Sequence, residues 1–259
     1  MIPPPPVPGD DRGLLLGDGL FETLLWLDDE LRCLDAHLDR LATGCETLGL
    51  PPLDRDEAAR LCRAAPGQAG VEAGRAAVRL TLTAGSGGRG LDRPDAPEVR
   101  LVAHAAATQP VSTSATLILA RTRRNEGSPA SRLKTLSYLD NVLARAEARA
   151  AGADEAVMLN NRGDLACASA ANLFWITGGK LFTPALSCGV LNGITRARVL
   201  NQAAALGVET AVVAASVEVL EDAEAAFLTN SLIGVRPVSR FEGRLYAPHD
   251  LVTRLRAGV

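Results

Sequence analysis

The first part of the chain alternates between the hydrophobic spacing of strands and that of helices. Apolar residues dominate positions 20–27 and 31–34, and the pair Asp28-Asp29 between them is typical of a hairpin turn. Apolar side chains then recur every three or four residues from Leu34 to Leu48, which is the spacing of one helix face. This pattern predicts a β-hairpin followed by an amphipathic helix.

A second helix and two further strands follow. Asp54 precedes Glu57 by three residues, the arrangement of a capping box, and predicts a helix with Asp54 as its N-cap. Strands are expected at 76–83 and 99–104, on either side of the glycine-rich segment 84–90.

The second part of the chain begins after a weakly patterned stretch at 105–114. A strand is expected at 117–120 and a helix from about Tyr138 to Ala151, ended by Gly152. Shorter elements are expected further on: strands at 157–159, 173–176, 211–213 and 226–228, and a helix from Thr195 to Ala205. The strands at 157–159 and 173–176 are expected to be successive and antiparallel, with a turn at 161–163.

Strands and helices that alternate in this way predict an α+β protein with mixed sheets and flanking helices. A small N-terminal α/β domain is expected over residues 1–107, a connector over 108–115, and a larger C-terminal domain over 116–259.

Composition narrows the class of protein. The chain has 259 residues, a net charge of −3 and a pI near 5.7, without a run rich in Lys and Arg, so no nucleic-acid partner is expected. No apolar run approaches the ~20 residues of a membrane span. Residues 1–8 lack the features of a signal peptide and are expected to be extended and polyproline-like. Five scattered cysteines without a CxxC pair fit a reducing cytoplasm, and three distant histidines do not suggest a metal site.

Lys134 is the first candidate for chemistry, because it immediately precedes the helix predicted from Tyr138. An amine that reacts with an aldehyde must be neutral part of the time, and burial or nearby cations lower a lysine pKa to that end. Arg132 and the start of the following helix are candidate sources of positive potential. From the local sequence alone, a surface lysine is the commoner interpretation.

Two segments have the composition of a phosphate site. Asn192-Gly-Ile-Thr195 combines a glycine, which permits close backbone approach, with a hydroxyl that can cap the following helix. Thr229-Asn-Ser231, followed by Gly234, offers a second group of donors after an apolar strand. Taken alone, the first segment is equally well interpreted as a simple N-cap.

Five segments occur in one order along the chain: GDGLFET at 17–23, the lysine segment at 132–145, ANLFW at 171–175, LNGITR at 191–196 and TNSLIGVRPV at 229–238. In this order and spacing they resemble the class IV (fold type IV) pyridoxal-phosphate enzymes. That family includes branched-chain aminotransferases, D-amino acid aminotransferases and 4-amino-4-deoxychorismate lyase. The resemblance implies a two-domain fold like that of D-amino acid aminotransferase, with pyridoxal 5′-phosphate bound by the larger C-terminal domain. It also implies a homodimer with sites near the subunit interface.

The resemblance assigns roles to individual residues. It makes Lys134 the lysine that bonds the cofactor aldehyde, and it makes the two candidate phosphate segments the loops that hold the cofactor phosphate from two sides. The positions that match cofactor-binding residues of the family are Arg40, Tyr138, Cys167, Gly193, Ile194, Thr195, Asn230 and Ser231. Arg40 would reach the phosphate, and Tyr138 would lie beside the 3′-hydroxyl. Taken alone, Arg40 is a solvated helix residue and Tyr138 a core residue at a helix start.

Cys167 departs from the family pattern. It stands five residues before Asn172, where the family usually has a glutamate that pairs with the pyridine nitrogen. A carboxylate there keeps the ring protonated and strongly electron-withdrawing, and a neutral thiol does not. Three interpretations remain open: Cys167 serves with a weaker electron sink, another acid such as Asp164 substitutes, or catalysis is impaired.

The expected reaction is that of the lyase, which converts 4-amino-4-deoxychorismate to 4-aminobenzoate and pyruvate in folate synthesis. The GSGGRG segment at 85–90, Asn230-Ser231 before Leu-Ile-Gly, and the short chain favour it, with Arg89 as a candidate for the substrate carboxylate. Glu22 and Tyr138 favour instead an aminotransferase of D- or branched-chain amino acids. A non-catalytic family member is the third alternative, because of Cys167.

Overall fold

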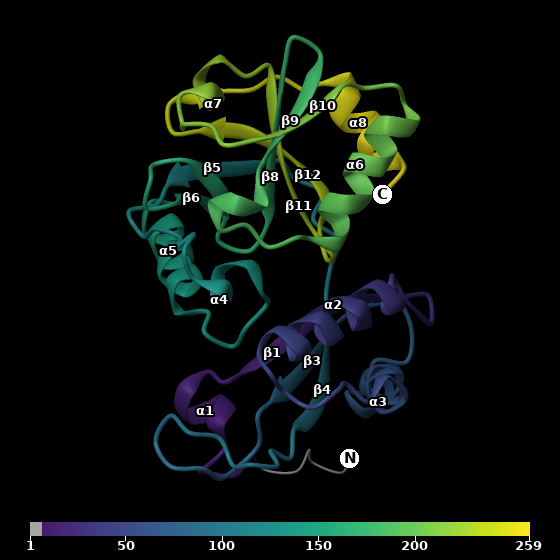
Figure 1. Cartoon of the computed structure of the whole chain (residues 1–259). Coiled ribbons are helices and arrows are strands. Elements are labelled where there is room, and N and C mark those ends of the chain that lie inside the picture. The colour runs from purple at the N-terminus through teal and green to yellow at the C-terminus, as the bar shows by residue number, and fades with distance from the viewer. Residues whose placement is uncertain (1–6) are drawn as a thin grey trace. The chain divides into compact units, whose positions relative to one another are not determined.

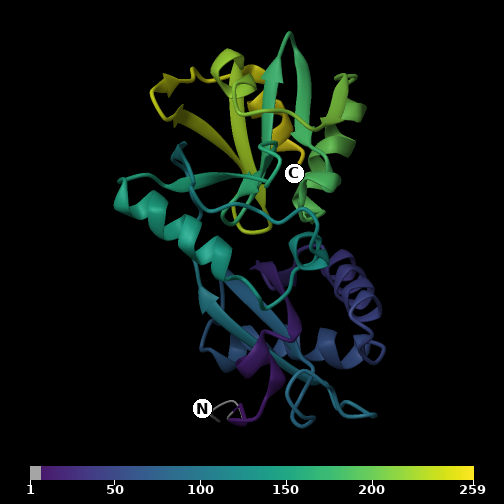
Figure 2. The same cartoon turned by 60° about the vertical axis from the view of Figure 1, so that its left-hand side comes forward.

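The computed structural model describes residues 7–259, and most of the extended segment expected at 1–8 lies outside that range. The chain divides into two compact units. The first contains the chain up to Pro110 together with Leu133–Ser137, and the second contains Val111–Arg132 and Tyr138–Val259. Each unit has its own helices and sheet (Figures 1 and 2). None of the helices in the described residues is long and apolar enough to cross a membrane.

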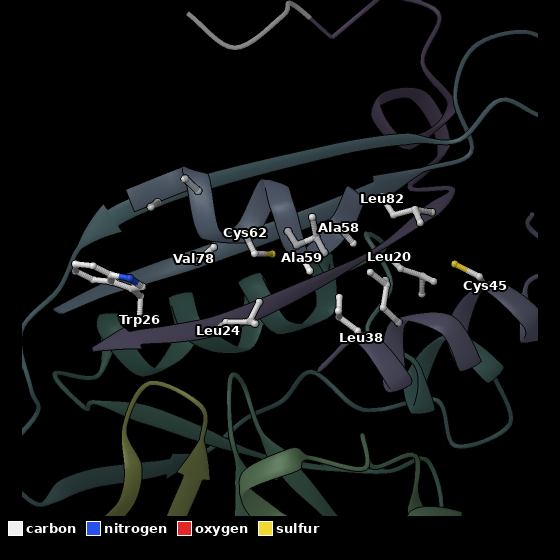
Figure 3. Close-up of a cluster of buried hydrophobic side chains, with 14 of the residues drawn as sticks. Leu20, Leu24, Trp26, Leu38, Cys45, Ala58, Ala59, Cys62, Val78 and Leu82 are labelled. Carbon is white, nitrogen blue, oxygen red and sulfur yellow. The ribbon is translucent and has the colours of Figure 1, made fainter. Parts of the chain in front are cut away.

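The first unit is built on an antiparallel sheet in the order β2-β1-β3-β4. Its strands are β1 (Gly19–Leu27), β2 (Glu30–Leu31), β3 (Arg75–Thr83) and β4 (Arg100–Ala107), and its helices are α1 (Arg12–Leu16), α2 (Leu34–Thr47) and α3 (Arg55–Gln68). Side chains alternate between the two faces of a strand, so the even-numbered Leu20, Leu24 and Val78 share one face. That face packs against α2 and α3 through Leu38 and Cys62 (Figure 3).

Local sequence accounts for most of these elements. Asp28 and Asp29 both have positive φ, as a two-residue hairpin turn of type I′ requires, and this confirms the expected hairpin. The second strand is shorter than expected, because Cys33 takes a left-handed conformation and α2 already begins at Leu34. The Asp54 carboxylate accepts a hydrogen bond from the Glu57 amide at 2.9 Å, which confirms the predicted N-cap of α3.

The short segment 133–137 belongs to the first unit, although the sequence placed it within the C-terminal domain. The Phe21 amide donates to the Lys134 carbonyl at 2.9 Å, and the Leu136 amide donates to the Gly19 carbonyl at 3.0 Å. One edge of β1 pairs with β3, and only the far end of the other edge pairs with β2. The segment therefore satisfies backbone groups that β1 would otherwise leave open.

The second unit contains a nine-stranded mixed sheet in the order β10-β9-β8-β11-β12-β5-β6-β7, with β13 on β12. Its strands are β5 (Ala115–Leu119), β6 (Glu155–Leu159), β7 (Leu165–Ala168), β8 (Asn172–Thr177), β9 (Lys180–Pro184), β10 (Thr210–Val213), β11 (Ala225–Asn230), β12 (Gly234–Phe241) and β13 (Arg244–Leu245). Its helices are α4 (Pro129–Arg132), α5 (Leu139–Ala150), α6 (Ile194–Ala205), α7 (Val219–Asp222) and α8 (Asp250–Ala257), with a 3₁₀ turn at Leu186–Cys188.

One expected strand pairing is wrong. The strands at 157–159 and 173–176 were expected to be successive and antiparallel, but β8 pairs with β9 and β11. The hairpin from β8 to β9 turns at Gly178-Gly179, both with positive φ, and occupies one edge of β8. The other edge is occupied by β11, so β7 pairs only with β6.

Candidate active site

Lys134 has the environment of a reactive amine. Its Nζ lies 4.3 Å from the centre of the Phe21 ring, and the Arg79 guanidinium carbon lies 3.8 Å from the same centre. Burial lowers the pKa of Lys134 to about 8, helped by the charges of Arg40 and Arg79 and opposed by Glu22. Since the sequence contains only two lysines, Lys134 and Lys180, a lysine here is an unusual choice of residue.

Glu22 follows Phe21 on β1, so its side chain is on the opposite face of that strand. There it forms a buried charge cluster that holds Arg40 in place. The Glu22 carboxylate is 1% exposed and accepts from Arg40 Nε at 2.8 Å and from Arg40 Nη2 at 2.6 Å. His37 Nδ1 lies 2.7 Å from the same carboxylate. Burial alone would raise the pKa of Glu22, but the hydrogen bonds from Arg40 and His37 outweigh it and hold the pKa below its usual value.

Arg79 is a candidate that sequence reasoning missed. The cations that depress the pKa of Lys134 are Arg40 and Arg79, whereas Arg132, the expected source, makes no such contribution and is exposed. Thr23 is the direct partner of Arg79 across the sheet, so Phe21 is a diagonal neighbour. Arg79 and Lys134 are far apart in the sequence, so only the pairing register of β1 and β3 reveals that Arg79 lies against the same Phe21 ring as Lys134.

The segment 191–196 forms the start of α6 in the second unit. Gly193 is the N-cap, has no side-chain cap hydrogen bond, and lies so close to Asn172 that a Cβ would collide with its Oδ1. Thr195 was expected as the cap but is the second residue of the helix, because glycine already occupies the cap position with extended backbone. The first amides of α6, including those of Ile194 and Thr195, are thus left without a side-chain acceptor.

The segment 229–231 lies beside that helix start. Asn172 on β8 is the partner of Thr229 on β11, and the Asn172 side chain donates to the Leu191 carbonyl at 2.9 Å. The strand pairing thus connects the two segments that were expected to bind phosphate. Asn230 uses its side chain locally, since its Oδ1 accepts from the amides of the next turn and its Nδ2 donates to Ala170. Ser231 follows it, partly exposed.

Cys167 is on β7, 7% exposed, within an apolar cluster rich in alanine. Burial raises the pKa of its thiol, with Arg124 and Glu155 acting in opposite directions, so the thiol is neutral at physiological pH. Asp164, considered as a substitute acid, accepts hydrogen bonds from Asn160 and Arg162 in the turn before β7. The described residues therefore place a neutral group where a carboxylate was expected.

Tyr138 and the neighbouring Asn141 are at the start of α5. Tyr138 is the N-cap residue and is partly buried. The Asn141 side chain links two parts of the unit: its Oδ1 accepts from Arg124 at 2.9 Å, and its Nδ2 donates to the Ser169 carbonyl at 2.7 Å. This network positions Arg124 near Cys167 and was not expected from the sequence.

Arg89 is exposed in the loop between β3 and β4. Arg12 holds this loop, because its guanidinium donates to the carbonyls of Leu91 at 2.8 Å and Asp92 at 3.0 Å, and to Asp18. A Cβ at Gly88 would collide with the Asp92 carbonyl, so the glycine there is required by close backbone approach.

The structure thus groups the predicted residues within each unit. Lys134, Arg40 and Arg89 belong to the first unit, where Arg89 is in the loop between β3 and β4. The second unit contains Tyr138, Cys167 and the two segments at 193–195 and 230–231.

The first unit contains a half-buried lysine of lowered pKa, and the second contains a helix start without a side-chain cap beside a strand end that carries hydroxyl groups. Both features are those expected of an enzyme that uses a lysine and a phosphorylated cofactor. The family model described as amino-transferase class IV matches residues 19–241. The chain belongs to that family.

Relatives within the family carry more than one name. The chain is 29% identical to the aminodeoxychorismate lyase of Vibrio harveyi, with 99% of this chain and 96% of the relative covered. It is 31% identical to the branched-chain-amino-acid aminotransferase of Pseudomonas aeruginosa, with 82% of this chain and 70% of the relative covered. The crystal structure of 4-amino-4-deoxychorismate lyase from Pseudomonas aeruginosa has a TM-score of 0.87 at 32% identity and covers 98% of this chain and 94% of its own.

Proposed function

We propose that this protein is a pyridoxal-phosphate-dependent lyase that converts 4-amino-4-deoxychorismate to 4-aminobenzoate and pyruvate. The observation that carries the proposal is Lys134, whose pKa near 8 makes its amine both a nucleophile and a proton carrier close to neutral pH. The lyase names among well-covered relatives support the choice of reaction.

The residues of the second unit fit the phosphate of this cofactor. The uncapped amides at the start of α6 favour an anion, and the hydroxyls of Thr195 and Ser231 are the further donors we assign to it. When bound, the cofactor supplies an aldehyde for the amine and a conjugated ring that withdraws electrons from the substrate. The fit is incomplete at the ring nitrogen, because Cys167 is a neutral thiol and offers no carboxylate.

The lyase reaction matches what these residues supply. Substrate and products contain the same atoms, so the reaction consumes no water, oxidant or second substrate. A proton leaves the six-membered ring of the substrate, and the bond between a ring carbon and the enolpyruvyl oxygen breaks. A proton is then delivered to the departing three-carbon unit, which becomes pyruvate. We assign these proton transfers to Lys134, since its amine is neutral in about half of the protein molecules at pH 8.

The experiment is a product assay with a matched amine control. Purified protein with cofactor is incubated with 4-amino-4-deoxychorismate, and 4-aminobenzoate and pyruvate are quantified together by chromatography. Equal yields of the two products, absent in Lys134→Ala and present in Lys180→Ala, are expected. A keto acid formed from an amino donor, with no 4-aminobenzoate, would instead establish the aminotransferase alternative.

Two other functions each have an observation in their favour. The branched-chain aminotransferase relative matches at an identity similar to that of the lyases, which supports transamination as the second candidate. Cys167 supports a non-catalytic member as the third candidate, and the absence of a cofactor absorption band at the edge of the visible range after reconstitution would favour it.

We also propose that the protein is a cytoplasmic homodimer. All five cysteines are free, which suits a reducing compartment. Apolar side chains are exposed on α1 at Leu14 and Leu15 and on α5 at Leu139 and Val142, and such patches are typical of surfaces that associate. Sedimentation equilibrium tests the dimer, and a mass of one chain at micromolar concentration would contradict it.

A further inference from the structure

Arg196 is a buried cation without a carboxylate partner. It is 4% exposed, and none of the ion pairs in the described part of the chain includes it. Its guanidinium makes two long hydrogen bonds, from Nη1 to Asn192 Oδ1 at 3.4 Å and from Nη2 to the Pro184 carbonyl at 3.3 Å. Its Nε is buried with no hydrogen-bond partner. A buried charge in this condition is costly unless something else compensates it.

The side chain of Arg196 is directed at the start of α6. Helix side chains tilt toward the N-terminus of their helix, and the hydrogen bond to Asn192 shows that this one does so. The same helix start carries amides that lack a side-chain cap, because Gly193 is the N-cap. The partial positive charge of the helix end and the guanidinium therefore lie together, and each raises the cost of the other.

Thr229 adds a second unsatisfied polar group on the same face of the sheet. Its hydroxyl is fully buried and has no hydrogen-bond partner in the described structure. Alternation along β11 places Thr229 on the side of Phe227, which packs against Val199 of α6. Its cross-strand partner Asn172 contacts the loop before α6. Buried polar groups usually have partners, so the unpartnered Arg196 Nε and Thr229 hydroxyl beside one helix start point to a ligand site there.

We infer that Arg196, together with the Thr229 hydroxyl, forms the buried base of an anion site at the start of α6, where it compensates the charge of a bound phosphate group. The inference rests on the proposed function in that the cofactor phosphate is the expected occupant. It also assigns the compensating charge to Arg196, which is buried beneath the loop before α6, and it predicts that free phosphate binds at the same place. Arg196 is a positioning residue: it acts through the helix start and loop, and the amides contact the anion.

The test measures binding of inorganic phosphate to the cofactor-free protein. Isothermal titration with phosphate, at constant ionic strength set by chloride, is carried out on wild type, Arg196→Met and Arg198→Met. Arg198 is the matched control, since it is an exposed arginine on the same helix. We expect Arg196→Met to weaken phosphate binding by about tenfold or more, equivalent to about 1.4 kcal/mol. Arg198→Met should leave it unchanged.

Thermal unfolding distinguishes this role from ordinary packing. Without phosphate, Arg196→Met should unfold at the wild-type temperature or above it, because an uncompensated charge has been removed. At the same phosphate concentration, wild type should gain more stability than the variant, because the variant binds phosphate more weakly. A large loss of stability in the phosphate-free variant, together with wild-type phosphate affinity in any folded sample, would overturn the inference.

Two further variants keep the test decisive if Arg196→Met does not fold. Arg196→Lys retains the charge and should retain part of the affinity, whereas Thr229→Val should weaken binding severalfold without loss of stability. Unchanged phosphate affinity in both would overturn the inference even if the lyase assay succeeds. Parallel titrations with pyridoxal phosphate and with pyridoxal separate the two sources of phosphate. Phosphate binding that depends on Arg196 in a protein without lyase activity would uphold this inference while refuting the proposed function.

Discussion

Single residues decide the chemistry of this protein, and Lys134 is the first of them. Its pKa of about 8 lies below the ordinary lysine value of 10.5 because burial and two arginines disfavour the charged form. Between these pH values the unfolded chain binds more protons than the folded one, so the contribution of Lys134 to stability increases as pH rises from 8 to 10.5. Below pH 8 the Lys134 amine is charged in the folded protein, so its burial lowers the free energy of unfolding by the full amount.

The reactivity of the Lys134 amine should follow the same pKa. Competitive reductive methylation of the cofactor-free protein from pH 6 to 11, analysed by mass spectrometry of peptides, should give a midpoint near pH 8 for Lys134. Lys180, the only other lysine and partly exposed beside Glu209, is read in the same sample as the reference. A midpoint above pH 10 for Lys134 would contradict the electrostatic account of the site.

Lys134→Ala should reduce turnover by at least about a hundredfold, the usual contribution of a positioned proton-transfer group. The fold should persist, because the amine is not part of the packed core and the segment is held by backbone hydrogen bonds to β1. Circular dichroism and the product assay check both statements. Near-normal activity in the variant, with wild-type behaviour of Lys180→Ala, would remove Lys134 from its assigned role.

Cys167→Glu tests the departure from the family pattern. A carboxylate at the ring nitrogen should favour the protonated ring, so single-turnover reaction with a suitable amino donor should be faster than in wild type. The lyase reaction should change less if its proton transfers depend mainly on Lys134. Rates are compared at saturating cofactor, with Cys167→Ser as the neutral control. Identical spectra and rates in both variants would mean that residue 167 does not face the ring.

At the scale of elements, the phosphate site depends on how a helix start and a strand end are joined. Thr195 is within the first turn of α6 and Ser231 follows β11, and the β8–β11 pairing brings their segments side by side. Thr195→Ala and Ser231→Ala should each weaken cofactor binding by about 1–3 kcal/mol, the value of a hydrogen bond to a charged group. Titration of cofactor into cofactor-free protein measures it, with the exposed Thr177→Ala as control. Unchanged affinity in both variants would move the phosphate elsewhere.

At the scale of the whole molecule, one short segment of the later chain belongs to the first unit, although the residues on both sides of it belong to the second. The segment 133–137 leaves the second unit, bonds to the open edge of β1, and thereby sets the backbone that carries Lys134. The amides of Phe21 and Leu136 should therefore exchange hydrogen as slowly as those of the β1–β3 ladder, because all of them are bonded within one sheet. Exchange measured by NMR checks this, with the exposed Gly90 amide as a fast reference. Fast exchange at Leu136 would mean that the segment is not part of the sheet.

The sequence by itself determined the local elements and the family. Periodicity predicted α2 from Leu34 to Leu48, the paired aspartates predicted the β1–β2 turn, and the Asp54–Glu57 capping box predicted the start of α3. These succeed because turn chemistry, caps and helix faces depend on residues a few positions apart. The ordered motifs were sufficient for the class IV family for a similar reason, since each is a short contiguous segment.

Only the tertiary structure decided which distant residues act on one another. It placed Arg79 and Lys134 against the same Phe21 ring, joined Glu22 to His37 and Arg40, and left Arg196 buried without a carboxylate. These relations depend on strand register and on which face each residue occupies, and a single chain does not encode register in any local pattern. The pKa of a lysine and the charge balance of an anion site are sums over such neighbours in space. They therefore become defined only when the chain is folded.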